Sequence, residues 1–214
     1  MFRRYILLLI VQCVLFVAYC QTDSIIYQCD FEDPEERALW NDEDRMNAGN
    51  QGKQCLNRWY LGKAGSNGGD YGLFVSEDGV TNNYTDKKPL TVVSYREVHL
   101  KAGSYEVSFD WQAAGWQDST NDVDGLYVCW VPSTQKTNSY NDNATMPQWV
   151  EDYALDFWGK GKKLSQENWN TVVDTVVSDG TPHKLVFVWR NGVTGVRPPA
   201  ACVDNILVMP VGYC

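Results

Sequence analysis

The chain is short of the residues on which many enzymes build their chemistry. It has 214 residues but only two histidines, His99 and His183, and neither lies in a catalytic motif. A Gly-x-Ser-x-Gly turn, a His-Glu-x-x-His helix and a phosphate-binding glycine loop are all absent. No Cys-x-x-Cys pair occurs either, so a zinc site is not expected. These absences predict a protein that is not an enzyme, although a pair of carboxylates that cleaves glycans stays an alternative.

Positive charge is also scarce. The chain has 18 Lys and Arg against 27 Asp and Glu, which gives a formal net charge of −9. This balance argues against nucleic acid and against anionic membrane surfaces as partners. It is compatible with neutral glycans, protein partners or divalent cations. Aromatic residues, by contrast, are plentiful, with nine Trp and twelve Tyr.

The N-terminus has the pattern of a secretory signal. Two arginines precede an apolar run over residues 5–19, which is short for a membrane span. The pattern predicts a signal peptide over residues 1–20 and a single domain over 21–214, secreted or at the cell surface, without a transmembrane span after signal removal. Acylation of Cys20, as in a lipoprotein, is the alternative to simple secretion. The bulky Tyr19 before it favours simple secretion.

Strand patterns cover most of the remaining chain. In residues 104–112, Tyr105, Val107, Phe109 and Trp111 alternate with polar residues, as in a strand that faces a core on one side. About nine such segments are separated by turn signals, and no helix longer than a single turn after Asp33-Pro34 is expected. The sequence therefore predicts an all-β sandwich. The expected strands are residues 25–32, 57–61, 72–76, 91–98, 104–112, 125–131, 169–177, 184–189 and 202–209.

The last of these strands carries an unusual carboxylate. On strict alternation Asp204 shares a face with Ile206 and Val208, and an ionised carboxylate on a buried face needs a cation or hydrogen-bond donors. If the terminal strands pair, Asp30 and Glu32 come close to Asp204. With backbone carbonyls these oxygens form the ligand set that Ca²⁺ prefers, so the three residues are the predicted ligands of a structural Ca²⁺. The alternative is that Asp204 accepts backbone N–H groups.

Several segments together resemble the MAM domain family, and most closely the MAM-like jelly rolls of bacterial surface proteins. Their order and spacing carry the resemblance, which extends over residues 27–212. The opening and closing patterns are also those of jelly-roll carbohydrate-binding modules. The matching segments are Cys29-Asp30-Phe31-Glu32 with Trp40, Asn57-Arg58-Trp59-Tyr60-Leu61-Gly62, Tyr71-Gly72-Leu73-Phe74-Val75-Ser76, residues 103–111, Phe187-Val188-Trp189-Arg190-Asn191, and Ala201-Cys202-Val203-Asp204-Asn205-Ile206.

The resemblance implies a jelly-roll β-sandwich of two antiparallel sheets with paired N- and C-terminal strands. It also implies a cation near both termini, adhesion or recognition without catalysis, and further domains in longer relatives. Leu39 stands where the animal MAM pattern has the cysteine that pairs with Cys29. The resemblance therefore leaves the partner of Cys29 open, and Cys214 is the expected one. Cys129 and Cys202, within apolar strands, are expected to be small buried core residues.

The aromatic residues divide into two groups. Those in predicted strands are expected in the core, whereas Trp116, Tyr140, Trp149 and Trp158 lie in loops, where they are the predicted ligand-binding residues. The sequence thus predicts a non-catalytic extracellular module for adhesion or recognition, whose partner is a cell-surface protein or a glycan. The alternative is a carbohydrate-binding module that targets polysaccharide.

Overall fold

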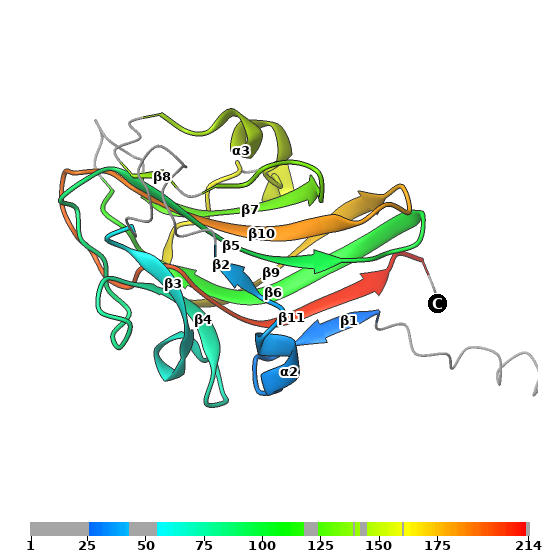
Figure 1. The fold of residues 1–214 in the computed structure, drawn as a ribbon, viewed down its shortest axis with the longest axis horizontal. Helices are drawn as coiled ribbons and strands as arrows, with labels where there is room; N and C mark the ends of the chain where they lie inside the picture. Colours follow the sequence, from blue (N-terminus) through cyan, green and yellow to red (C-terminus); the bar gives the residue numbers. More distant parts are fainter. Residues whose placement is uncertain are drawn as a thin grey trace, which may run out of the picture.

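A computed structural model describes residues 26–42, 55–117, 124–138, 140–141, 145–159 and 161–212. In these ranges two antiparallel β-sheets pack face to face (Figure 1). The first sheet has the order β3-β4-β11-β6-β9, with β1 paired to β11, and the second has the order β2-β5-β10-β7, with β8 paired to β5. The predicted jelly-roll β-sandwich is confirmed.

Most strand bounds follow the predicted segments, but β1 is shorter than predicted, and β2 and β8 were not expected. The first sheet contains β1 (Tyr27–Cys29), β3 (Arg58–Gly62), β4 (Gly72–Ser76), β6 (Gly103–Ala113), β9 (Gln166–Ser178) and β11 (Cys202–Pro210). The second contains β2 (Asn41–Asp42), β5 (Leu90–Val98), β7 (Gly125–Pro132), β8 (Tyr140–Asn141) and β10 (His183–Asn191). The short helices are α2 (Pro34–Arg37), η2 (Lys63–Gly65), α3 (Gln148–Tyr153) and η3 (Phe157–Gly159).

The main core lies between the two sheets. Its aromatic centre joins β6 to β10, where the rings of Phe109 and Phe187 meet edge to face with centroids 5.3 Å apart. Both side chains are fully buried, as is Trp189 further along β10. Alternation in β6 and β10 therefore places the aromatics in the core as predicted, and burying such large rings supplies much of the stability of the sandwich.

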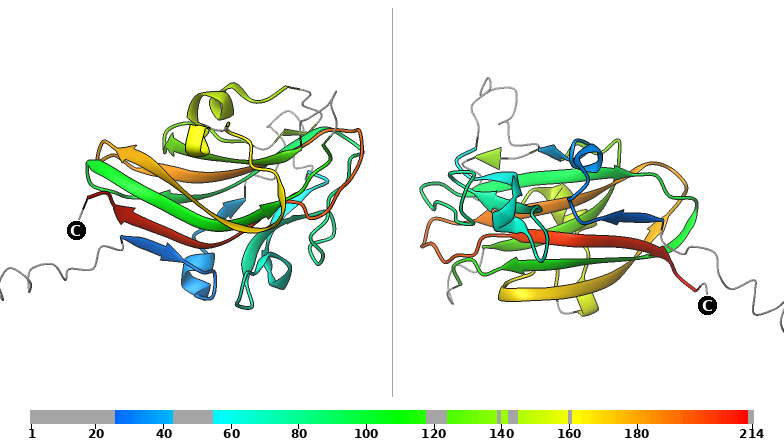
Figure 2. Two further views of the ribbon diagram at one scale, coloured as in Figure 1. Left: turned by 180° about the vertical axis from the view of Figure 1, so that it is seen from behind. Right: turned by 90° about the horizontal axis from the view of Figure 1, so that it is seen from below.

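The two terminal strands lie side by side, which confirms their predicted pairing (Figure 2). Strand β1 is antiparallel to β11, and Cys29 lies opposite Ile206. After β1 the chain turns into α2, which Asp33 caps: its carboxylate accepts from the N–H of Glu35 at 2.9 Å. This is the single helical turn that the Asp33-Pro34 pattern predicts.

The prediction that Asp204 shares the core face of its strand with Ile206 and Val208 is wrong. Between Asp204 and Leu207 the register of β11 against β6 shifts by one residue, and Asn205 has a positive φ of 51°. This bulge moves the alternation by one position, so Val203 and Ile206 both point into the core between the sheets. Asp204 lies on the opposite, outer face of the first sheet. It is nevertheless only 1% exposed.

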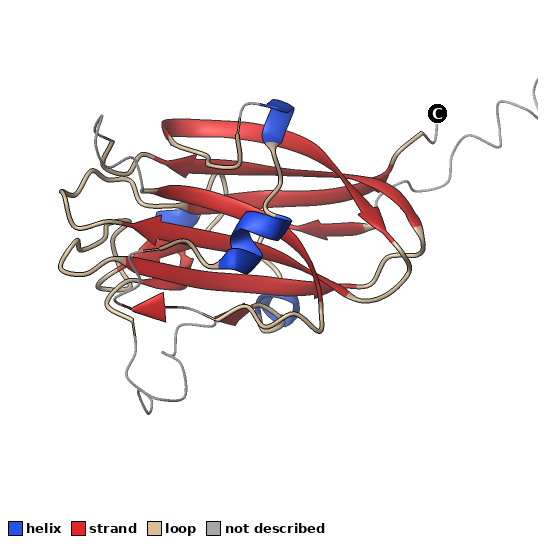
Figure 3. Ribbon diagram, turned by 90° about the horizontal axis from the view of Figure 1, so that it is seen from above, coloured by secondary structure: helices blue, strands red, loops and turns tan. Residues whose placement is uncertain are grey.

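The second sheet is covered on its outer face, and here a helix appears where none was expected. Helix α3 lies across this face (Figure 3). Its residues Trp149 and Val150 pack with Val186, Val188 and Cys129 of the strands beneath, in a small cluster separate from the main core. The following chain pairs with β7 through bridges at residues 154 and 164, which cover its edge. None of the described helices is long and apolar enough to cross a membrane.

Candidate functional site

Two loops meet at the end of the sandwich where β6 finishes. The backbone N–H of Ala114 donates to the carbonyl of Pro199 at 2.8 Å, and the N–H of Gly115 donates to the carbonyl of Arg197 at 3.1 Å. The segment after β6 is therefore tied to the segment that precedes β11. This attachment fixes the position of the next residue, Trp116.

A buried tyrosine and a buried aspartate form hydrogen bonds to both loops. The Tyr84 hydroxyl donates to Asp124 Oδ2 at 2.6 Å and accepts from the N–H groups of Trp116 and Arg197, each at 3.0 Å. Asp124 Oδ1 accepts from the N–H of Gly192 at 2.7 Å. Tyr84 is 2% and Asp124 1% exposed. Such a satisfied buried network fixes the backbone around it.

The environment shifts the pKa values of both groups. Burial raises the pKa of the Tyr84 hydroxyl, and its hydrogen bond to the Asp124 carboxylate raises it further. Burial also raises the pKa of Asp124, while the hydrogen bonds from Tyr84, Gly192 and Trp116 favour the carboxylate and oppose the rise. The two groups therefore act together as a neutral donor and a buried acceptor.

The indole of Trp116 rests on the backbone of Gly195. A Cβ added at Gly195 would lie 2.7 Å from Cδ2, 2.9 Å from Cε3 and 3.0 Å from Cε2 of the ring. Because Cδ2 is a ring-fusion carbon, it is approached this closely only through a face of the indole. The glycine thus supports one face, and Trp116 keeps 37% of its surface exposed.

Polar residues are connected to Trp116 through the chain and through the Tyr84 hydrogen bonds. Gln117 follows Trp116 and donates from Nε2 to the carbonyl of Asp124 at 2.8 Å. Arg197 Nη2 lies 3.0 Å from Glu167 Oε2, in an ion pair whose side chains are both more than half exposed. We call the group of Trp116, Gln117, Glu167, Gly195 and Arg197 the Trp116 platform.

The predicted metal ligands lie at a different place, where the terminal strands meet residues 66–71. Glu32 Oε1 accepts from the N–H groups of Asp70 and Tyr71 at 2.7 and 2.9 Å. Asp204 Oδ2 accepts from the N–H of Asn67 at 2.7 Å, and its Oδ1 from the N–H of Asn205 at 2.8 Å. The two carboxylates thus hold one loop at two points, which agrees with the alternative that Asp204 accepts backbone N–H groups.

Negative charge accumulates at this place. Burial raises the pKa of Asp204 to about 6, and repulsion from Asp110 and Asp30 contributes to the rise, while the N–H donors of Asn67 and Asn205 oppose it. Among the described residues, no group of three or more His, Cys, Asp or Glu side chains could by itself hold a metal ion. A cation here would need backbone carbonyls as further ligands, and the Ca²⁺ site stays a prediction.

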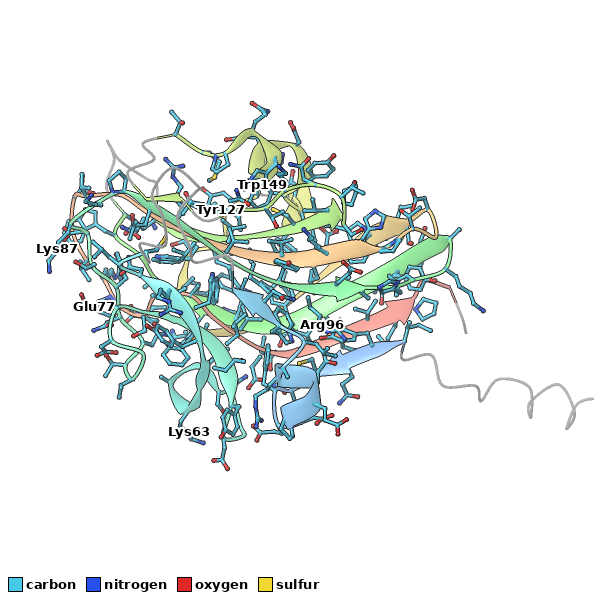
Figure 4. The ribbon with its side chains drawn as sticks, in the orientation of Figure 1. Lys63, Glu77, Lys87, Arg96, Tyr127 and Trp149 are labelled. Atoms are coloured by element: carbon cyan, nitrogen blue, oxygen red, sulfur yellow. The ribbon has the colours of Figure 1, made fainter. Side chains whose placement is uncertain are left out.

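The predicted ligand-binding aromatics differ in their exposure and in whether their side chains are described. Trp149 is only 6% exposed, and Figure 4 shows it with Tyr127 between α3 and β7. The side chains of Tyr140 and Trp158 lie outside the described residues, so their predicted ligand contact stays a prediction. Trp116 is the one predicted ligand residue with a described and substantially exposed ring.

The cysteines are only partly described, and the N-terminal signal lies outside the described residues. Cys129 and Cys202 are fully buried, as predicted, and Cys29 is buried at the end of β1. Its expected partner Cys214 lies outside the described residues, as does the signal at residues 1–20 with its alternative lipid anchor at Cys20. The disulfide and the export of the chain stay predictions.

Sequence reasoning missed Tyr84, Asp124 and Gly195. The signal for Asp124 is its place directly before Gly125 and an apolar strand. Tyr84 lies in a polar loop and Gly195 in another. Tyr84 and Gly195 are distant from Trp116 along the chain, and although Asp124 is only eight residues away, nothing in the local sequence indicates that these residues meet.

Comparisons with known proteins give structural similarity only. No protein-family model matches the chain, and no curated protein sequence matches it. The xylan-binding CBM22-1 domain of Paenibacillus barcinonensis Xyn10C is 10% identical over 87% of this chain and 94% of that chain, with a TM-score of 0.45. Similarity at this level assigns neither a ligand nor an activity, and the MAM resemblance stays a prediction.

Two further solved structures show the same level of similarity. The CBM22-1–GH10 modules of Clostridium thermocellum xylanase Xyn10B are 14% identical over 90% of this chain and 29% of that chain, with a TM-score of 0.47. The mannan-recognising module TmCBM27 is 12% identical over 87% of this chain and 98% of that chain, with a TM-score of 0.38.

Proposed function

We propose that this chain is a non-catalytic extracellular module that binds carbohydrate through the Trp116 platform. The observation that carries the proposal is an exposed indole whose other face is fixed on the backbone of Gly195. The electron-rich face of an indole attracts the polarised C–H groups on one side of a sugar ring. The exposed side chains of Glu167 and Arg197 supply hydrogen-bond acceptors and donors for its hydroxyl groups.

The platform is also rigid before any ligand arrives. The Tyr84–Asp124 pair holds the N–H of Trp116 and the N–H of Arg197 through one hydroxyl group. Less conformational entropy is therefore lost when a ligand binds. Such a site suits sugars, which bind weakly, because a small entropy cost is a large part of a small binding free energy.

The sequence predicts adhesion or recognition with a cell-surface protein or a glycan as the partner, and the surface supports a protein partner less well. A stable protein interface takes roughly 800 Å² from each partner and has an apolar centre. Among the described residues around the Trp116 platform, the exposed large hydrophobics are Val193 and Val196 in the neighbouring loop, which form only a small patch. A single aromatic ring among polar groups suits a sugar better.

The test is binding to a panel of plant and microbial polysaccharides by affinity electrophoresis and calorimetry. Trp116→Ala should weaken binding by about tenfold or more, because an anchoring aromatic supplies a large share of the binding energy. Tyr71→Ala is the matched control, since Tyr71 is equally 37% exposed but lies in the loop before β4. The proposal is wrong if no glycan binds, or if Trp116→Ala binds as tightly as the unchanged chain.

We further propose that Asp30, Glu32 and Asp204, together with backbone carbonyls, bind a structural Ca²⁺ near the paired termini. The donors are all oxygen, and a divalent cation would neutralise the repulsion that Asp30 and Asp110 exert on the buried Asp204. It would stabilise the sandwich and take no part in ligand chemistry.

Removal of the metal tests this site. EDTA should lower the melting temperature by several degrees, since a loss of 1 kcal/mol corresponds to roughly 2–4 °C in a domain of this size. Asp204→Ala should remove the response to CaCl₂, whereas Asp152→Ala, at an exposed position in α3, should keep it. An unchanged melting temperature in EDTA would rule the site out.

A further inference from the structure

A pocket of about 270 Å³ lies on the outer side of the second sheet, under the segment that contains α3. Its apolar wall is formed by Tyr127, Met146 and Val150. Figure 4 shows Tyr127 on the side of β7 that faces α3. This volume is slightly below the roughly 300–1,000 Å³ of sites for drug-sized ligands, so the pocket suits one sugar ring or a similar small group.

The charged lining of this pocket is mainly positive. Lys162, Lys163 and Glu151 are its charged lining residues, and we call it the Lys162–Lys163 pocket. The Lys162 ammonium donates to the backbone carbonyl of Glu151, and Lys163 Nζ donates to Gln117 Oε1 at 2.9 Å. Two ammonium groups beside one carboxylate stand out in a chain whose net charge is −9.

A third cation lies behind the same face. Arg190, on β10, is only 5% exposed. Burial lowers its pKa, while the nearby Tyr127, Glu151 and Asp124 oppose the change. The guanidinium remains charged at neutral pH because its ordinary pKa is above 12. Arg190 thus adds a positive charge near Tyr127 and Glu151 of the pocket, and the buried Asp124 offsets part of it.

The pocket is directly connected to the Trp116 platform. The Lys163 side chain lies across Gly125, where an added Cβ would come 2.6 Å from Lys163 Cγ. It then reaches Gln117, the residue next to Trp116, which belongs to the platform. An extended ligand that stacks on Trp116 can thus place a neighbouring group beside Lys163.

We propose that the Lys162–Lys163 pocket accepts the carboxylate of a uronic acid residue in the glycan that stacks on Trp116. This inference rests on the proposed function and adds to it the chemical class of the ligand, an acidic polysaccharide. Hydrogen bonds from an ammonium to a carboxylate are stronger than those between neutral groups. Lys162 and Lys163 supply such donors at the rim, and the apolar wall of Met146 and Val150 suits the C–H face of the sugar.

The experiment compares oligosaccharides of galacturonate, glucuronate and mannuronate, each beside its neutral methyl ester, by calorimetry at low ionic strength. At least one acid should bind about tenfold more tightly than its ester, and added NaCl should reduce this preference. Lys162→Gln/Lys163→Gln should lose the preference. The matched control Lys87→Gln/Lys101→Gln removes two exposed lysine charges outside the pocket and should retain it.

The outcomes separate the two proposals. Equal binding of every acid and its ester, or an unchanged preference in Lys162→Gln/Lys163→Gln, overturns the uronate pocket while glycan binding at Trp116 stands. Equal binding of dextran sulfate would reduce the site to general attraction of polyanions, which also overturns it. If neither the acids nor any neutral glycan binds, both proposals fall. Thermal melting of each variant verifies that it is folded.

Discussion

At the scale of single residues, the Trp116 platform depends on what Gly195 lacks. Only a hydrogen atom stands between its Cα and the indole, so the ring lies flat against the backbone. Any side chain at this position must displace the ring. The exposed tryptophan is thus held in one orientation by a residue that contributes no side-chain contact.

Gly195→Ala should therefore weaken glycan binding severalfold with little loss of stability. Its methyl group would lie 2.7 Å from Trp116 Cδ2, and a half-exposed ring can move away at a cost below about 1 kcal/mol. Calorimetry with the best glycan from the panel, together with urea unfolding, measures both effects. Gly62→Ala is the control, because its Cβ would make ordinary contact with Phe74 at 3.6 Å. Unchanged affinity in Gly195→Ala would mean that ring orientation does not matter.

At the scale of elements, one hydroxyl group joins three loops. Tyr84 comes from the loop before β5, and its hydroxyl group contacts Asp124 before β7, Trp116 after β6 and Arg197 before β11. Each of these strands ends at the same side of the sandwich. The position of the platform is therefore a property of this shared hydrogen-bond network.

Tyr84→Phe should destabilise the chain by about 1–3 kcal/mol, because it leaves the buried Asp124 carboxylate without its shortest hydrogen bond. It should also reduce glycan affinity, since the loop that carries Trp116 loses one of its attachments. Tyr105→Phe is the control: it removes one hydroxyl donor to the Lys101 carbonyl at the turn between β5 and β6. Urea unfolding and calorimetry distinguish the two variants, and equal effects on affinity would contradict the assigned role of Tyr84.

The strands were predictable because their evidence is local. Alternation in β6 and the apolar run of β10 identify both strands and the faces that they bury. The face of Asp204 was not predictable, because one residue in a left-handed conformation at Asn205 shifts the pattern and no sequence signal announces it. Contacts such as Glu32 with Asp70, or Gly195 with Trp116, join distant positions and follow only from the tertiary fold.

At the scale of the whole molecule, the excess of negative charge and the buried carboxylate of Asp204 both lower the stability of the chain as the pH rises. The chain has a net charge of −9 at neutral pH and a calculated pI of about 4.7, so lowering the pH from 7 reduces its self-repulsion. Asp204 adds a local contribution of the same sign. Its pKa is about 6 in the folded chain against an ordinary 3.8, so the folded chain binds this proton more tightly than the unfolded chain.

In EDTA, the free energy of unfolding should therefore fall as the pH rises from about 4 to about 6, by at most about 3 kcal/mol for Asp204. Asp204→Asn should remove this part of the slope, and the exposed Asp152→Asn should not. NaCl screens the repulsion between surface charges far more than the cost of the buried carboxylate, which separates the two contributions.

In CaCl₂ the dependence of the unfolding free energy on pH should reverse, because a bound cation favours ionised Asp204 and the affinity for Ca²⁺ rises as the carboxyl loses its proton. An identical slope in EDTA and CaCl₂ would contradict a metal at this carboxylate, and an identical slope in Asp204→Asn would show that its pKa is not raised.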